Sequence, residues 1–256
     1  MKNKCIYIVI ATGLFFSACN DDDETLTSTP AEENYPTDGL VAYFPFDSSY
    51  QDVVTTETQE TPTGNLAYTV DREGKSGSAI EFLGNEQYLE VELAGSLTGS
   101  PNHEASIAVW VLPNPDGLGG TRLLAETTLA SFQCRSFKNT SLKIGGSFAY
   151  GLEENPTGTT GIATGSSKSV AENTWVHIAL TVGNGEFRIY VNGELIYSDN
   201  VFEHNGQPVE PIFEPFNQFV LGANYTKGEY WIGVMDDLFF YKRMLTQEEI
   251  NLLYTL

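Results

Sequence analysis

Residues 175–197 carry the segment WVHIALTVGNGEFRIYVNGELIY, which decides the fold class. Along residues 175–182, strongly apolar side chains alternate with smaller or polar ones, which is the period-two pattern of a strand with one buried face. Residues 186–191 repeat this alternation after a glycine-rich turn. Asn192-Gly193, a dipeptide that tolerates positive φ at both positions, then turns the chain into a further strand. The segment therefore predicts a three-stranded antiparallel meander.

Further short strands are predicted on both sides of this meander, separated by turn residues among the 24 glycines and 11 prolines of the chain. Thr246 and Glu249 fit a capping box at the start of one short amphipathic helix near the C-terminus. Many short strands at this spacing favour an all-β fold, an antiparallel two-sheet jelly-roll sandwich. The other predicted strands are residues 40–46, 79–84, 88–93, 106–113, 122–127, 146–153, 218–225 and 233–241.

The N-terminus has the features of an export signal. Two lysines precede a charge-free run, residues 6–18, which is shorter than the ~20 apolar residues of a membrane span. Cys19 follows Phe16-Ser17-Ala18, which resembles a bacterial lipobox with phenylalanine in place of the usual leucine. We therefore predict a lipoprotein signal peptide over residues 1–18, an acidic flexible tether over residues 19–37 and one β-sandwich domain over residues 38–256.

Four acidic residues, 21–24, follow Cys19 closely. An acidic run behind a lipidated cysteine resembles the signal by which Bacteroidetes export lipoproteins to the outer face of the outer membrane. We expect Cys19 to carry a lipid anchor in that membrane, with the domain facing the cell exterior. The alternative is an ordinary signal peptide followed by an incidental cysteine and a solvated acidic linker.

The charge balance excludes one class of partner. The chain has 13 Lys+Arg against 34 Asp+Glu, a formal net charge of −21. Phosphate backbones repel such a chain, and it has no basic cluster that would hold it to an anionic membrane surface. Nucleic acid is therefore excluded as a partner. Among sugars, neutral ones are favoured over uronic-acid or sulfated ones, because like charges repel.

Several chemically distinctive side chains are predicted to be structural. Trp110, Trp175 and Trp231 lie in strand-like patterns and are expected in the core. His177 lies in the middle of a strand and is expected to be a hydrogen-bonded structural histidine. Cys134 is expected to be a small packed side chain, because a catalytic thiol needs a positioned histidine.

Five segments of the chain match one family pattern in order. They are GLVAYFPFDSSYQD (39–52), SGSAIEFLGNEQYLEV (76–91), SIAVWVLPN (106–114), NTWVHIALTV with FRIYVNGELI (173–196) and LGANYTKGEYWIGVMDDLFFYKRMLTQEEINLLY (221–254). Together they resemble the laminin-G-like jelly rolls of the concanavalin A-like lectin/glucanase superfamily. Residues 114–172 match poorly, and Phe239 stands where the family often has an exposed basic residue.

The resemblance covers enzymes as well as binding modules, so it does not decide function. The laminarinase-type hydrolases of the superfamily carry Glu-x-Asp-x-x-Glu on one strand, and this chain has no such spacing. Asp236 and Asp237 are adjacent, so in a regular strand their carboxylates point to opposite faces. We therefore expect no catalytic residues, and a glycoside hydrolase stays an alternative.

The resemblance also implies a metal. In related jelly rolls an aspartate of the last strand helps to bind a structural calcium ion in contact with the first strand. By position this aspartate is Asp236, with Asp47 or Asp52 as partners, since calcium prefers carboxylate and carbonyl oxygens. The alternative is that Asp236 only accepts backbone hydrogen bonds.

A carbohydrate-binding module needs aromatic rings that stack on sugars and a few fixed polar groups. Tyr225 and Tyr230 flank a turn and Asn224 adjoins it, so these three residues are the predicted ligand-binding set. The sequence thus predicts a surface lipoprotein with a non-catalytic, lectin-like domain that binds a neutral polysaccharide or oligosaccharide and assists polysaccharide capture. The alternative is a protein-interaction or adhesion module of an outer-membrane assembly, which would use an apolar patch around Phe239 and Phe240.

Overall fold

The structure, a computed structural model, describes most of the chain from residue 34 onward. The predicted signal peptide, Cys19 and Tyr225 lie outside the described residues, so lipid anchoring stays a prediction. The described ranges are 34–97, 104–114, 122–126, 132–138, 141–152, 162–201, 203–204, 207–208, 211–212, 216–224 and 226–256.

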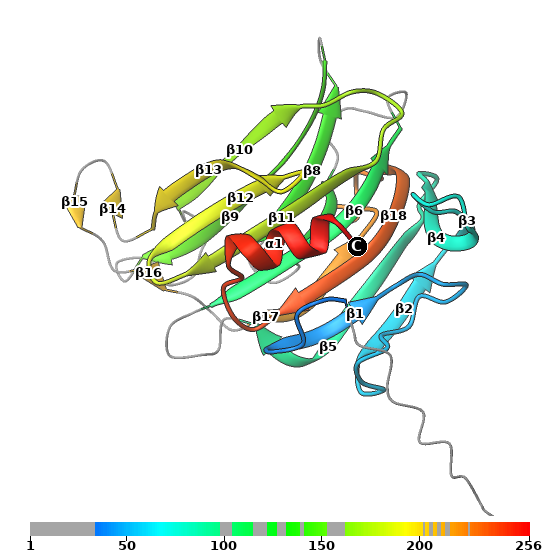
Figure 1. Cartoon of the computed structure of the whole chain (residues 1–256), viewed down its shortest axis with the longest axis horizontal. Helices are drawn as coiled ribbons and strands as arrows, with labels where there is room; N and C mark the ends of the chain where they lie inside the picture. Colours follow the sequence, from blue (N-terminus) through cyan, green and yellow to red (C-terminus); the bar gives the residue numbers. More distant parts are fainter. Residues whose placement is uncertain are drawn as a thin grey trace, which may run out of the picture. The chain divides into compact units, whose positions relative to one another are not determined.

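Two antiparallel sheets of eight strands each form the domain (Figure 1). The first sheet has the strand order β13-β12-β11-β6-β18-β4-β3, with β1 paired to β18. The second sheet has the order β10-β9-β8-β7-β17-β5-β2, with β16 paired to β9, and β14 pairs only with β15. The bounds are β1 Leu40–Phe44, β2 Gln59–Thr63, β3 Ala67–Val70, β4 Ser76–Leu83, β5 Tyr88–Leu97, β6 Ala105–Pro113, β7 Arg122–Glu126, β8 Phe132–Lys138, β9 Leu142–Leu152, β10 Ile162–Ser169, β11 Val176–Gly183, β12 Glu186–Val191, β13 Glu194–Asn200, β14 Glu203–His204, β15 Gln207–Pro208, β16 Pro211–Ile212, β17 Phe216–Leu221, β18 Ile232–Tyr241 and α1 Gln247–Tyr254.

The predicted fold class, an antiparallel jelly-roll sandwich with one short C-terminal helix, is confirmed. The meander predicted from residues 175–197 is β11-β12-β13, and the apolar set of β11 packs between the sheets. Phe187 of the first sheet stacks on Phe148 of the second, with ring centroids 5.4 Å apart. Gly146 of β9 allows this approach, because a Cβ there would lie 2.5 Å from a methyl group of Leu180.

Helix α1 covers the outer face of the first sheet, where Figure 1 shows it lying across the strands. Thr246 caps the helix, and its hydroxyl and the Glu249 carboxylate form the predicted capping box. Ile250 and Leu253 pack on Ala179 of β11. The expectation that this sheet buries only one face is therefore wrong, because α1 buries the second face and every residue of β11 is buried.

Seven of the described strands escaped the sequence patterns: β2, β3, β8, β10 and the two-residue strands β14, β15 and β16. Strand β2, with the sequence QETPT, and β10, with IATGSSKS, have little apolar alternation. Both lie at an edge of the second sheet, where one neighbouring strand is enough. Such strands are defined by backbone hydrogen bonding to a neighbouring strand rather than by burial of side chains. A search for hydrophobic alternation therefore does not detect them.

The chain enters the domain before residue 38. The ring of Tyr35 packs on Tyr43 and Phe239, with centroids 5.0 and 5.4 Å away. The hydroxyl of Tyr241 donates to the carbonyl oxygen of Pro36 at 2.9 Å. Among the described residues, no helix has the length and apolar character needed to cross a membrane.

Candidate functional site

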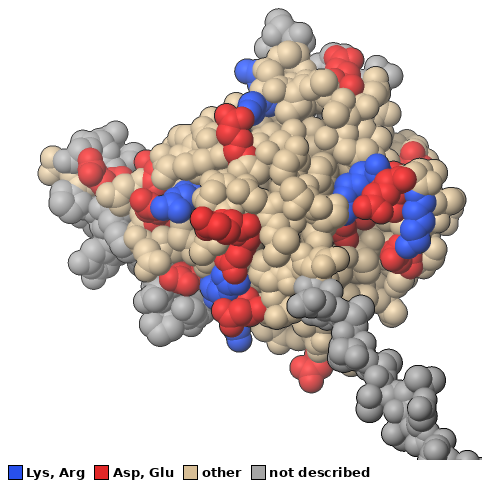
Figure 2. All heavy atoms as spheres, in the orientation of Figure 1, with Lys and Arg blue, Asp and Glu red and all other residues tan. Residues whose placement is uncertain are grey.

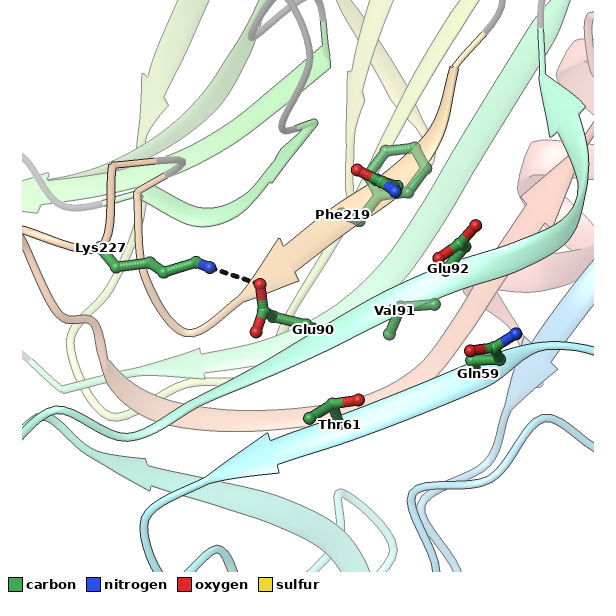
Figure 3. Close-up of a pocket in the computed structure, with 8 residues that line it drawn as sticks. Gln59, Thr61, Glu90, Val91, Glu92, Phe219 and Lys227 are labelled. Atoms are coloured by element: carbon green, nitrogen blue, oxygen red, sulfur yellow. Dashed lines mark hydrogen bonds and ion pairs between the residues drawn. The ribbon is translucent and has the colours of Figure 1, made fainter.

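A polar groove of about 330 Å³ lies on the outer face of the second sheet, over β2, β5 and β17. Along β5 the side chains alternate, so that Leu89 and Val91 enter the core while Glu90 and Glu92 face outward. Figure 3 shows Glu90, Glu92, Gln59, Thr61 and Lys227 around this groove. We name it the β2–β5 groove; its lining residues are Gln59, Thr61, Glu90, Val91, Glu92, Gln218, Phe219 and Lys227.

Strand register places the polar side chains of the groove in rows across the sheet. Gln59 lies opposite Glu92, and Glu92 lies opposite Gln218. Thr61 and Glu90 form the next row. Neighbouring strands are about 4.8 Å apart, so each row offers hydrogen-bonding groups at close, regular spacing. Such an array suits a ligand rich in hydroxyl groups.

Three of these groups are available to a ligand. Within the described part of the chain, the side chains of Gln59, Thr61 and Glu92 make no hydrogen bond or ion pair. Glu90 differs, because its carboxylate is paired with the ammonium of Lys227 (Figure 3). That hydrogen bond raises the pKa of Lys227, and the ammonium also lies 5.5 Å from the ring centroid of Tyr88.

The predicted loop, residues 224–230, borders the β2–β5 groove through Lys227. Asn224 is buried, and its Oδ1 accepts from the hydroxyl of Thr226 and from the backbone N–H of Gly228 and of Glu229. The oxygen of Asn224 therefore organises the loop from within. Its role as a ligand-binding residue stays a prediction, since these three contacts commit its carbonyl oxygen to the loop.

Tyr230 is half-buried and lies beside the groove. Its ring stacks on Tyr88 with centroids 6.5 Å apart, and its hydroxyl donates to the carbonyl of Lys227 at 2.7 Å. Tyr88 belongs to the same outward-facing set of β5 as Glu90. The two rings thus form an aromatic border to a polar groove, which is the combination expected of a sugar site.

Sequence reasoning found the loop but missed the groove. The segment YLEVEL carries a signal for part of the groove, since its period-two alternation puts Glu90 and Glu92 on the same face of a strand. Gln59 and Thr61 lie on β2, which was not predicted as a strand. Only pairing with β5 brings these two side chains to the carboxylates.

The predicted metal ligands lie apart from this groove, in the first sheet, where β18 runs between β6 and β4. Asp236 and Asp237 both bind Arg72, whose Nη1 lies 2.5 Å from Asp236 Oδ2 and 2.6 Å from Asp237 Oδ2. The prediction that these carboxylates point to opposite faces is wrong. Asp237 has a left-handed φ of 44° at a bulge in β18, so the strand alternation is interrupted there.

Asp47 and Asp52 do not join Asp236 as a ligand set. Asp47 is exposed and paired with Lys75 at 2.7 Å. Asp52 is buried; its Oδ1 accepts from the backbone N–H of Tyr43 and of Val54, and its Oδ2 from Thr58. Within the described ranges, no group of three His, Cys, Asp or Glu side chains could hold a metal ion. These residues do not fit a shared calcium ion, and calcium binding stays a prediction of the resemblance.

The environment of Asp236 is unusual for a carboxylate. Burial, with the nearby charge of Asp237, raises the pKa of Asp236 to about 7, although Arg72 acts in the opposite direction. Tyr43 donates a hydrogen bond of 2.5 Å to Asp237, and burial next to that carboxylate raises the pKa of its hydroxyl. On the face of the molecule that Figure 2 displays, acidic and basic side chains are intermixed.

The apolar patch expected for a protein partner is absent at its predicted place. Phe239 and Phe240 are both buried. Phe239 stacks on Tyr43 with ring centroids 4.2 Å apart and is covered by Tyr35, whereas Phe240 lies in the core between the sheets. The interpretation of these two residues as an exposed contact surface is wrong.

The remaining distinctive side chains are structural. Cys134 is buried, and burial raises the pKa of its thiol to about 12, so the thiol stays protonated. His177 packs against Trp110 and Tyr254, but its Nδ1 has no hydrogen-bond partner among the described residues. Trp231 lies fully in the core, whereas Trp175 is only half-buried.

Known structures share this fold. The ligand-binding domain of botulinum neurotoxin serotype D, in complex with N-acetylneuraminic acid, matches with a TM-score of 0.64 and 13% identity over 85% of this chain. The chain spans about half of that structure, 51% of its length. Domain 4 of a GH43 extracellular arabinanase from Geobacillus stearothermophilus, in complex with arabinotriose, matches with a TM-score of 0.57 and 19% identity, over 84% of this chain and 98% of that one. At these identities the likeness shows the fold alone.

Sequence comparison assigns the family. No curated protein matches the chain. A family model described as the concanavalin A-like lectin/glucanases superfamily matches residues 83–251, which is more than half of the chain and includes β5, β11 and β18. The chain therefore belongs to the concanavalin A-like lectin/glucanases superfamily.

Proposed function

We propose that this domain binds an uncharged glycan in the β2–β5 groove. The observation that carries the proposal is the set of unpaired polar side chains, Gln59, Thr61 and Glu92, aligned in rows next to the paired rings of Tyr88 and Tyr230. A sugar presents hydroxyl groups to the rows and a C–H face to an aromatic border. Two solved structures of similar fold are complexes with arabinotriose and with N-acetylneuraminic acid, which supports a glycan as the ligand class.

A neutral glycan suits the charges of the groove. Two carboxylates, Glu90 and Glu92, face it, and one cation, Lys227, is already paired with Glu90. The unpaired carboxylate of Glu92 would repel uronic-acid or sulfated chains, while it accepts hydrogen bonds from neutral hydroxyl groups.

The role that we propose is binding without cleavage. A glycosidase needs one carboxylic acid that stays protonated and a second carboxylate positioned across the scissile bond. The carboxylate of Glu90 is paired with Lys227, and Arg72 is bound to both Asp236 and Asp237. Neither pair offers a free acid to a substrate.

We also propose that the domain is presented on the cell surface through a lipid on Cys19 and assists polysaccharide capture. The charge-free run that precedes Cys19 and the acidic run that follows it support this proposal. The groove lies on the outer face of the second sheet, whereas Tyr35, where the chain enters the domain, packs on the outer face of the first. Tyr35 therefore lies on the other face of the domain from the groove.

A glycan array followed by calorimetry tests the proposal. We expect the purified protein to bind neutral oligosaccharides and not their uronic-acid or sulfated counterparts. Gln59→Ala combined with Glu92→Ala should abolish binding, whereas Glu248→Gln, on the exposed side of α1, should not change it. Incubation with the bound oligosaccharide should release no reducing ends. Binding that survives the double substitution would place the site elsewhere, and cleavage would establish a hydrolase.

A further inference from the structure

Arg72 lies at a junction of three parts of the fold. It belongs to the turn between β3 and β4, which Asp71 shapes by accepting from the backbone N–H of Glu73 and of Lys75. From this turn its guanidinium reaches Asp236 and Asp237 of β18. Its Nη2 also donates to the carbonyl oxygen of Leu256, at the end of the chain, at 3.2 Å.

Both carboxylates need the guanidinium because they are buried. The exposed fractions are 3% for Asp236 and 8% for Asp237. A buried charge without a partner is strongly unfavourable, and Arg72 is the cation that faces both side chains. Tyr43 supplies the second contact of Asp237 by donating its hydroxyl proton. The left-handed backbone of Asp237, rare for a residue other than glycine, is thus held by two side chains that meet its carboxylate.

The planar guanidinium of Arg72 also contacts an aromatic ring. Its carbon lies 5.2 Å from the ring centroid of Trp110, which is within the range of a cation–π contact. Trp110 in turn stacks on Tyr254 of α1, and its Nε1 donates to the carbonyl of Leu253. Arg72 therefore ties the β3–β4 turn to β18 and to the helix that covers the first sheet.

We infer that Arg72 takes the place that the family resemblance gives to calcium, and that the stability of this domain does not depend on calcium. Calcium requires about six to eight oxygen ligands. Here Nη1 of Arg72 already lies at 2.5 and 2.6 Å from the two aspartate oxygens that a cation would need. Asp47 is bound to Lys75, and Asp52 accepts three hydrogen bonds from its own neighbourhood. The positive charge is built into the chain.

Thermal unfolding with and without calcium tests this inference on the purified protein. We expect the same Tm in EDTA and in millimolar calcium chloride, and no calcium in the protein by elemental analysis. A Tm that falls in EDTA and recovers with calcium would overturn the inference. This arm uses the wild-type protein, so it decides the question even if a variant fails to fold.

Three variants distinguish the buried Arg72 from a surface cation. Arg72→Ala should lower the Tm by on the order of 10 °C, because it leaves two buried carboxylates unpaired. Arg72→Lys should recover only part of that loss, since an ammonium keeps the charge but loses the planar contact with Trp110. Lys75→Ala, which removes an exposed pair with Asp47, should shift the Tm by no more than about 2 °C. An Arg72→Ala protein as stable as the wild type would overturn the inference.

Discussion

The indole Nε1 of Trp231 donates a hydrogen bond of 2.7 Å to the hydroxyl of Ser136. Ser136 belongs to β8 of the second sheet, and Trp231 directly precedes β18 of the first, so this bond joins the two sheets through the core. Both side chains are fully buried. Gly233 lies against the same ring, since a Cβ at this position would be 2.5 Å from two of its atoms.

Trp231→Phe should destabilise the domain by about 2–4 kcal/mol, because it removes buried ring volume and leaves the Ser136 hydroxyl unpaired. Urea unfolding measures the change. Ser136→Ala is the matched control and should cost about 1 kcal/mol. If Trp231→Phe changed the free energy of unfolding by less than Ser136→Ala does, the ring would not be a main contributor to the core.

In the β2–β5 groove, Glu92→Ala should weaken glycan binding on the order of tenfold, because a hydrogen bond to a charged group contributes about 1.5–3 kcal/mol. Gln59→Ala should weaken it less, since its amide is neutral. Glu92 is on the outer face, and its side chain makes no hydrogen bond or ion pair with the described residues, so neither change should alter the Tm. Calorimetry and a thermal scan on the same samples check both statements, and unchanged affinity would remove Glu92 from the site.

The loop that borders the groove gives a separate prediction. Tyr230→Ala should weaken binding about five- to thirtyfold through the loss of a stacking ring, whereas Tyr230→Phe should keep the affinity. Tyr225→Ala, the other ring predicted from the sequence, is tested in the same series. Asn224→Ala should mainly lower stability, because three donors in the loop lose their acceptor. Equal affinities for Tyr230→Ala and wild type would exclude stacking by this ring.

His177 gives a pH dependence with a defined sign. Burial, together with Arg72, lowers the pKa of His177 to about 3, whereas an unfolded histidine titrates at about 6.5. The unfolded state therefore binds a proton at higher pH than the folded state does. Below about pH 6.5, this difference lowers the free energy of unfolding by about 1.4 kcal/mol for each pH unit.

His177→Phe keeps a ring against Trp110 and Tyr254 but cannot titrate. Between about pH 7 and about pH 4.5, the wild type should lose about 2–3 kcal/mol more stability than this variant. Urea unfolding of both proteins at the two pH values measures the difference. The carboxylates titrate alike in both proteins, so their contribution to the loss of stability cancels. Equal losses would mean that the histidine is already solvated in the folded state.

Membrane anchoring is tested at the predicted lipidation site. Cys19→Ala should release the protein from the membrane fraction or leave its precursor unprocessed, because it removes the thiol at the predicted lipidation site. Fractionation and metabolic lipid labelling read this out, with Cys134→Ala as the control that keeps Cys19. A Cys19→Ala protein that still carries lipid would contradict the lipoprotein prediction.

The sequence by itself determined the fold class, and the reason is that its signals are local. Alternation in residues 175–182 and the turn at Asn192-Gly193 depend only on neighbours along the chain, and they specified the β11-β12-β13 meander. The capping box of Thr246 and Glu249 specified the start of α1 in the same way.

Only the tertiary structure decided which side chains meet. Arg72 and Asp236 are 164 positions apart, and nothing between them predicts their ion pair. The carboxylates of Asp236 and Asp237 share it because a bulge interrupts the alternation that a sequence argument must assume. Likewise, Gln59 reaches Glu92 only through the pairing of an edge strand that carries no apolar pattern. Local preferences set each strand, whereas register and bulges, which depend on the packing of the whole sheet, set the candidate site.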